Sequence, residues 1–198
     1  MKVLVACEYS GRVRDAFIAL GHDAMSCDLL PSDTEGMHYQ GDVFDVIKDD
    51  WDLMIAHPPC TFLANSGVQH LHKSTERWVD LFKAAKFFKA LLDADIQKIV
   101  IENPIMHKYG KQLIGSTQSQ VIQPWMFGHT EQKATCLWLK GLPNLKTTNN
   151  VKEQMMALPK NKRERLHYLP PSADRWKLRS TTYQGIADAL AAQFGGQI

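Results

Sequence analysis

The sequence predicts an α/β fold with a mostly parallel, doubly wound sheet. The first observation is a set of short apolar runs with the length and composition of buried strands. These runs lie at residues 2–7, 24–27, 53–56, 98–101, 120–123 and 135–139. The second observation is that helical patterns lie between several of these runs, as expected for strands of one parallel sheet. The 198 residues, 44% of them hydrophobic, suffice for one domain with a packed core.

Three amphipathic helices are predicted from apolar residues at three- and four-residue intervals. The first runs from Arg12 to about Leu20, the second begins near Ser74, and the third runs from Tyr183 to Phe194. The residues expected to face the core are Val13, Phe17 and Leu20 in the first, Trp78, Leu81, Phe82, Ala85, Phe88, Leu91 and Leu92 in the second, and Ile186, Ala187, Leu190 and Phe194 in the third. The aromatic residues of the second helix are therefore interpreted as core, not as a surface that stacks on bases.

The first strand, a polar turn at Ser10-Gly11, the first helix and a second strand that ends in Asp28 follow one another in the order of a Rossmann-type nucleotide site. Asp28 lies 17 residues past Gly11, near the distance expected for a carboxylate that binds a ribose. Asp28 could instead end the strand and begin a turn. Gly41-Asp42 follows a polar loop, and Asp42 could bind an adenine amino group or cap the short helix after it.

The apolar run Leu53–Ala56 stops at Pro58 and Pro59, which cannot continue a strand ladder, and Cys60 follows directly. Ligands of open α/β sheets bind at the carboxyl ends of the strands, so Cys60 is a candidate nucleophile. The alternative is a small buried side chain, the commonest fate of a free cysteine. Glu102 ends the next strand at the same edge, where partial burial would allow its carboxyl to carry a proton near neutral pH. It could otherwise brace a loop.

Cysteine spacing and hydropathy exclude several classes of protein. The four cysteines form no CxxC pair, so neither a structural metal site nor a disulfide framework is expected. A reducing compartment, the cytoplasm, fits this usage best. The N-terminus runs directly into a strand without the features of a signal peptide, and no apolar run approaches the length that spans a membrane.

Charge is unevenly distributed along the chain. Residues 140–180 contain ten basic and three acidic residues, a net charge of +7, whereas the whole chain carries only +2. The remainder of the chain therefore carries −5. This segment is either a solvated basic face or a surface that contacts a polyanion, for which nucleic acid phosphate is the leading candidate.

These motifs together resemble the cytosine-C5 DNA methyltransferases, and the sequence is most similar to the short methylase-like proteins carried by bacteriophages. Pro59-Cys60 resembles the family's nucleophile motif, and Glu102-Asn103 resembles its Glu-Asn motif. The turn at Ser10-Gly11 stands where the glycine-rich cofactor loop stands in the family. Asp28 and Asp42 stand at the ribose and adenine contacts, and the resemblance implies that Pro58 binds the cofactor as well.

The resemblance implies S-adenosylmethionine as cofactor, DNA as substrate and the cytoplasm, of a host cell if the gene is carried by a phage, as location. It implies that Cys60 adds to carbon 6 of cytosine and that a protonated Glu102 binds ring N3. It also implies substrate contacts from Pro59, Asn103 and Lys133. Residues 1–139 would form the catalytic and cofactor-binding core. Residues 140–180 would form a reduced target-recognition region, and residues 181–198 a helix that packs back on the core.

Three departures from the family pattern keep other functions open. The cofactor loop lacks the aromatic, glycine-rich pattern, and Gln132-Lys133-Ala134 replaces a motif that contains arginines. Only about forty residues, 140–180, are available for target recognition. These departures leave room for an accessory protein or a further copy of the chain, for a single-stranded substrate, or for a free cytosine nucleotide such as dCMP or dCTP. They also allow a non-catalytic DNA-binding or regulatory protein on a methyltransferase scaffold.

Overall fold

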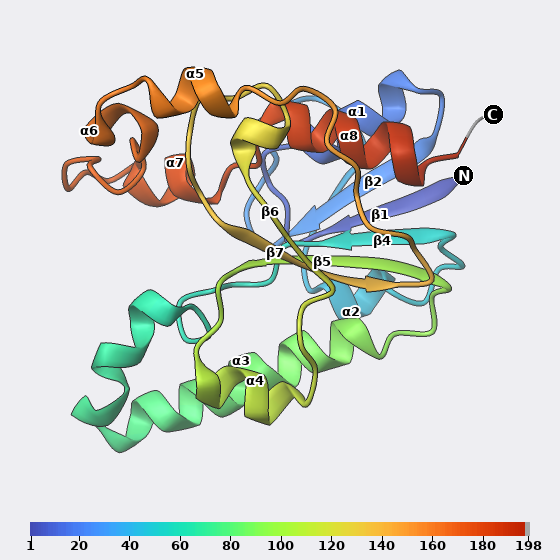
Figure 1. The fold of residues 1–198 in the computed structure, drawn as a ribbon. Helices are drawn as coiled ribbons and strands as arrows, with labels where there is room; N and C mark the ends of the chain where they lie inside the picture. Colours follow the sequence, from blue (N-terminus) through green and yellow to red (C-terminus); the bar gives the residue numbers. More distant parts are fainter. Residues whose placement is uncertain (197–198) are drawn as a thin grey trace.

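A seven-stranded sheet forms the centre of the computed structural model, which describes residues 1–196 (Figure 1). The strands are β1 (Lys2–Ala6), β2 (Asp23–Asp28), β3 (His38–Gln40), β4 (Leu53–Ala56), β5 (Lys98–Pro104), β6 (Gln120–Ile122) and β7 (Thr135–Lys140). Their order is β3-β2-β1-β4-β5-β7-β6, and β7 alone runs antiparallel to its neighbours. This is a Rossmann-like, doubly wound and mostly parallel sheet, and it confirms the predicted fold class.

Helices cover both faces of the sheet (Figure 1). They are α1 (Arg12–Ala19), α2 (Val43–Val46), η1 (Asn65–Lys73), α3 (Thr75–Leu92), α4 (Lys108–Ile114), η2 (Pro124–Met126), α5 (Lys152–Met156), α6 (Lys160–Arg163), α7 (Arg175–Ser180) and α8 (Gln184–Phe194). Helices α1 and α8 pack on one face around a core that includes Phe17 and Leu190. Helices α2, α3 and α4 pack on the other face, around a core that includes Phe88 and Trp138. The strands are buried on both faces, which explains their nearly continuous apolar sequences.

Most predicted elements are present, and four expectations about them were wrong. Strand β3 was not predicted, because its three residues carry no apolar run and pair only with β2. Residues 140–180, whose sequence is interpreted as mostly loop with one short helix, hold three short helices. Leu20 is 46% exposed because α1 ends before it, and Phe82 is 55% exposed on the outer side of α3. Residues 197–198 of the predicted C-terminal segment lie outside the described residues.

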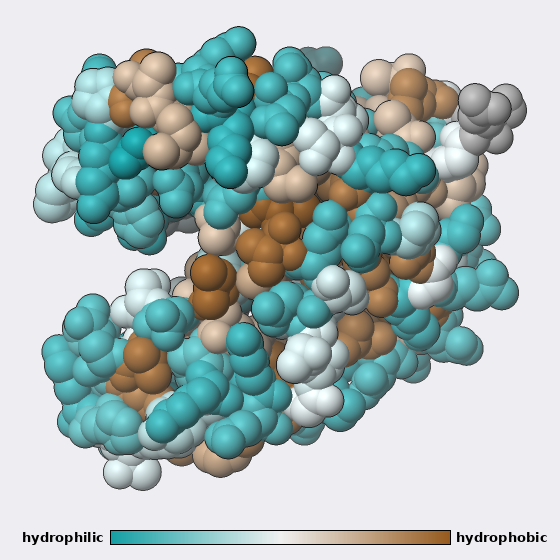
Figure 2. Space-filling model, in the orientation of Figure 1, coloured by the Kyte–Doolittle hydropathy of each residue, from teal (hydrophilic) through white to brown (hydrophobic). Residues whose placement is uncertain are grey.

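A cleft opens at the carboxyl ends of the parallel strands (Figure 2). Helices α5, α6 and α7 form one rim of this cleft, and η1 with the adjoining ends of α3 and α4 forms the other (Figures 1 and 2). From β1 the sheet extends in one direction through β2 to β3, and from β4 it extends in the other direction through β5. The strand order therefore reverses between β1 and β4. Ligands of open α/β sheets bind at such reversal points. Within residues 1–196, no helix is both long enough and apolar enough to cross a membrane.

Candidate active site

The turn after β4 carries Cys60 and is anchored to the neighbouring strand. Backbone pairing with β1 continues for one residue, through a bond from His57 N to Ala6 O of 2.9 Å. The two prolines then end the ladder, because proline has no N–H to donate. The side-chain amide of Asn103 in β5 donates to the carbonyl oxygen of Pro58, at 2.9 Å. This bond fixes the position of the turn, and Cys60 emerges from it half-buried.

His57 and Glu102 form an ion pair at the carboxyl edge of the sheet. The register of β4 on β5 pairs Ala56 with Ile101, so the next residue of each strand lies side by side. Nδ1 of His57 lies 3.1 Å from Oε2 of Glu102, and the two side chains are only 10% and 16% exposed. This pair was missed by sequence reasoning. Its only sequence signal was that each residue follows a buried strand at the same edge of the sheet.

The structure corrects the expectation that Glu102 is protonated. Burial alone would raise the pKa of Glu102, but the hydrogen bond from His57 and the charge of Lys133 outweigh it and hold this pKa below its usual value. Burial would likewise lower the pKa of His57, but the bond and charge of Glu102 outweigh burial and raise it. The proton of the pair therefore resides on His57, and Glu102 is ionised.

Cys60 lies in the electrostatic field of the same groups. Burial, followed by the negative charge of Glu102, raises the pKa of the Cys60 thiol. The positive charges of Lys133 and Arg179 oppose this rise. The resting thiol is therefore neutral, and a base must take its proton before the sulfur can act as a nucleophile. Arg179 lies in residues 140–180, the basic segment, and was not singled out as a site residue from the sequence.

A pocket of about 170 Å³ lies at the reversal point between β1 and β4, and Pro59, which precedes Cys60, is part of its lining. Asp28, Asp42 and Pro59 line it together with Cys7 and Phe87. The structure therefore brings two of the predicted cofactor-binding carboxylates to one pocket. Pro58, also predicted to bind cofactor, is buried and does not line it.

The two aspartates fit the donors of an S-adenosyl cofactor. Oδ1 of Asp28 accepts from the backbone N–H of Leu30 at 3.0 Å, and Oδ1 of Asp42 accepts from that of Phe44 at 3.0 Å. Within residues 1–196, the second oxygen of each carboxylate has no hydrogen-bond partner. Each can accept from a ribose hydroxyl or an adenine amino group, which are the donors that a nucleoside presents.

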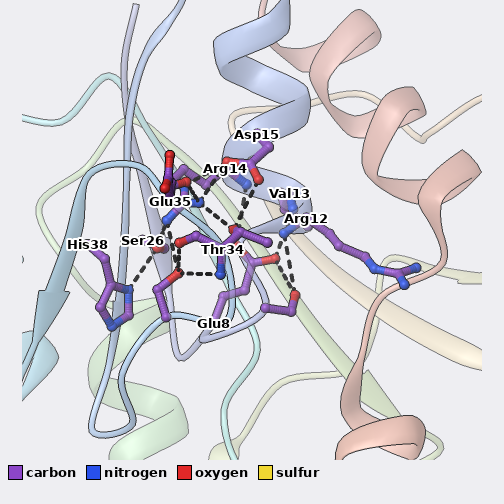
Figure 3. Close-up of polar contacts among 11 residues, drawn as sticks. Glu8, Arg12, Val13, Arg14, Asp15, Ser26, Thr34, Glu35 and His38 are labelled. Atoms are coloured by element: carbon purple, nitrogen blue, oxygen red, sulfur yellow. Dashed lines mark hydrogen bonds and ion pairs between the residues drawn. The ribbon is translucent and has the colours of Figure 1, made fainter.

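Ser10 and Gly11 shape the loop after β1 and do not line the pocket. Oε1 of the buried Glu8 accepts from Val13 N at 2.8 Å and from Ser10 Oγ at 3.1 Å (Figure 3). Gly11 has a φ of 72°, a left-handed conformation that side chains rarely adopt, and it begins α1. Because the Glu8 carboxylate already occupies the positive end of α1, this helix end does not present free N–H groups to an anionic ligand.

Arg14 is fully buried and ties the β2–β3 loop to α1 (Figure 3). Its guanidinium donates to Ser26 at 3.1 Å, to Ser32 at 3.2 Å and to Thr34 at 2.7 Å. It also pairs with Asp15 at 2.8 Å. The loop that follows Asp28 is thereby held against the first helix. Sequence reasoning missed this role because Arg14 falls on the polar side of the predicted helix.

Comparisons with known proteins concern the fold only. No known protein family matches the sequence, and no curated protein matches it. Solved structures with similar folds include a DNA modification methyltransferase encoded within a prophage of E. coli, at 15% identity, with 81% of this chain and 56% of that chain covered and a TM-score of 0.44. The Entamoeba histolytica methyltransferase EhMeth is 12% identical, with 76% and 57% covered and a TM-score of 0.47. The S. pombe Dnmt2 methyltransferase is 13% identical, with 88% and 61% covered and a TM-score of 0.43. The chain spans less than two thirds of the length of each.

Proposed function

We propose that the protein transfers a methyl group from S-adenosylmethionine to carbon 5 of cytosine in DNA. The observation that carries the proposal is the grouping of a half-buried cysteine with a buried His–Glu pair, on a turn whose Pro59 lines a pocket with two aspartates that, within the described residues, each keep one carboxylate oxygen free. Cys60, His57 and Glu102 come from neighbouring strand ends, and Asp28 and Asp42 line the pocket. When bound, the cofactor supplies an electrophilic methyl group on a sulfonium.

Cytosine carbon 5 is a weak nucleophile, and the proposed site activates it by covalent addition at carbon 6. The Cys60 thiol first gives its proton to a base, and the sulfur then forms a bond to carbon 6. Electron density moves to ring N3, which takes a proton from the His57–Glu102 pair. Carbon 5 can then take the methyl group, whose bond to the sulfonium sulfur would break and leave a neutral thioether. A base removes the carbon 5 proton, the bond between carbon 6 and the Cys60 sulfur breaks, the Cys60 thiolate regains a proton, and N3 returns its proton to the pair.

Because Glu102 is ionised, the proton that N3 receives comes from His57, and the net proton transfer to N3 is unchanged. His57 holds the proton at rest, because its pKa is raised and that of Glu102 is lowered. As negative charge develops at N3, Glu102 can take the proton from His57 and pass it on to N3. The pair thus provides the same net step as a protonated glutamic acid.

A methyl-transfer assay with labelled S-adenosylmethionine tests the proposal. Cytosine-containing duplex DNA, single-stranded DNA and dCMP should be compared, which separates nucleic acid from free nucleotide as substrate. Cys60→Ser should abolish transfer, whereas Cys136→Ala, which removes a buried thiol from β7, should retain it. An oligonucleotide with 5-fluorocytosine should form a denaturation-resistant complex with the wild type alone, since its carbon 5 has no proton to lose. Absence of transfer to all three substrates would overturn the proposal.

A further inference from the structure

Helix α7 presents a partly exposed tryptophan at the rim of the cleft. Trp176 is 48% exposed, and its ring centroid lies 5.5 Å from that of the buried Tyr9. The hydroxyl of Tyr9 lies 3.0 Å from Oγ of Ser180, at the end of the same helix. Nζ of Lys177 lies 3.3 Å from Asp33 and 5.8 Å from the Trp176 ring centroid. The indole is therefore held against the body of the protein while much of its surface faces solvent.

This helix lies next to the candidate active site. Nζ of Lys133 donates to the carbonyl oxygen of Arg179 at 2.9 Å. The same Lys133 lowers the pKa of Glu102 by its charge, and Arg179 acts in the same way on Cys60. A nucleic acid that placed a base over Cys60 would therefore have its neighbouring nucleotides close to α7.

The basic segment contains no element suited to reading a duplex groove. Its helices, α5, α6 and α7, have five, four and six residues, and residues 141–180 contain no strand. Readout in the major groove uses an α-helix or a two-stranded ribbon that enters the groove. Exposed aromatic rings beside basic groups are instead typical of proteins that bind single strands, because an unpaired base has a free face on which to stack.

We propose that this rim binds a single-stranded nucleic acid, with one base stacked on Trp176 and the backbone phosphates near Arg175 and Arg179. The inference rests on the proposed function and assigns its substrate class. The net charge of +7 on residues 140–180 complements a polyanion. Tyr9 and Lys177 hold the ring before the strand arrives, so little conformational freedom is lost on binding.

Equilibrium binding of dye-labelled oligonucleotides tests the inference independently of methyl transfer. A short single-stranded DNA of mixed sequence should bind more tightly than the same strand annealed to its complement. An RNA of the same sequence shows whether the sugar is distinguished. Trp176→Ala should weaken single-strand binding about tenfold, the effect expected from losing one stacked base, and Trp176→Phe should recover most of the affinity. Binding should also weaken as salt increases.

Tyr168→Ala is the matched control, because Tyr168 is 55% exposed in the same basic segment. It should leave binding unchanged, and thermal melting should verify that all three variants fold. Tighter binding of the duplex, wild-type affinity in Trp176→Ala, or equal losses in Trp176→Ala and Tyr168→Ala would each overturn the inference. Methyl transfer to duplex without single-strand preference would refute this inference alone, whereas single-strand binding without any transfer would refute the proposed function alone.

Discussion

Two acidic side chains at the carboxyl edge of the sheet are bound in opposite ways. Glu8 follows β1, is 4% exposed, and accepts hydrogen bonds from the backbone N–H groups of Val13 and Arg14 at 2.8 and 3.3 Å. Glu102 lies near the end of β5 and is held by the side chain of His57, at 3.1 Å. Both carboxylates are largely buried, and both residues lie near the carboxyl end of a parallel strand.

The difference lies in what the partner can do. A backbone N–H does not titrate, so Glu8 is a permanent acceptor that stabilises the start of α1. The imidazole of His57 can gain and lose a proton, and its pKa is raised by Glu102, so Glu102 has a partner with which it can exchange a proton. The comparison teaches that burial of an acid does not by itself indicate catalysis. A titratable partner at the mouth of a cleft is the more informative feature.

Replacing Glu102 with Gln should have the largest effect on activity. The amide keeps the shape of the side chain but cannot accept and pass on a proton. We expect kcat/KM for methyl transfer to fall by about 10²- to 10⁴-fold, the usual contribution of general acid–base catalysis. Steady-state kinetics and thermal melting should be measured together. A Glu102→Gln protein with near wild-type activity would show that the His57–Glu102 pair does not move the proton.

Replacing Glu8 with Ala should affect stability more than chemistry. The change removes the cap of α1 and leaves two buried N–H groups without an acceptor. We expect a loss of roughly 2–3 kcal/mol in the free energy of unfolding, measured by urea denaturation. Glu8→Gln retains one acceptor oxygen and should lose less. If Glu8→Ala instead loses activity per folded molecule as strongly as Glu102→Gln, the contrast between the two acids is mistaken.

Asp42 lies between these extremes, because one of its oxygens accepts from the backbone N–H of Phe44 and the residue also lines the pocket. Asn is as good an N-cap as Asp, so Asp42→Asn should preserve α2 and remove only the charge. We expect the affinity for S-adenosylhomocysteine to fall about tenfold, as for a lost hydrogen bond to a charged group, measured by calorimetry. Asp45→Asn is the matched control, because Asp45 binds Tyr39 and does not line the pocket. If Asp42→Asn and Asp45→Asn bind S-adenosylhomocysteine with equal affinity, Asp42 does not contact the cofactor.

The smallest effect concerns the pH dependence of stability. The pKa of His57 is raised from 6.5, so its contribution is complete below about pH 6.5 and is lost as pH rises through the raised value. The pKa of Glu102 is lowered from 4.5, so its contribution is present above about pH 4.5 and is lost as pH falls through the lowered value. The pair is therefore fully charged between about pH 4.5 and 6.5.

His57→Gln removes the pair and exposes this dependence. The difference in unfolding free energy between wild type and His57→Gln should be greatest in that window, on the order of 1 kcal/mol larger than at alkaline pH. Denaturation curves across pH measure it. A difference that does not vary with pH would mean that the two side chains do not share a proton in the folded protein.

Several candidate site residues could be proposed from the sequence because their signal is local. Cys60 and Glu102 each follow an apolar run that ends near proline, and Asp28 ends a strand after a glycine turn. His57 was not recognised, because its partner lies 45 residues away in the sequence and only the strand register brings them together. Arg14 was not recognised either, because the loop that buries it has no periodic pattern.

The sequence by itself determined the fold class and the candidate nucleophile, since hydrophobic periodicity and proline act on the chain locally. Only the tertiary structure decided the charge of Glu102. A pKa depends on every group within a few ångströms, and His57 and Lys133 reach Glu102 from other segments. The tertiary structure also decided the position of Trp176 beside the cleft, because that position follows from the packing of its ring on Tyr9.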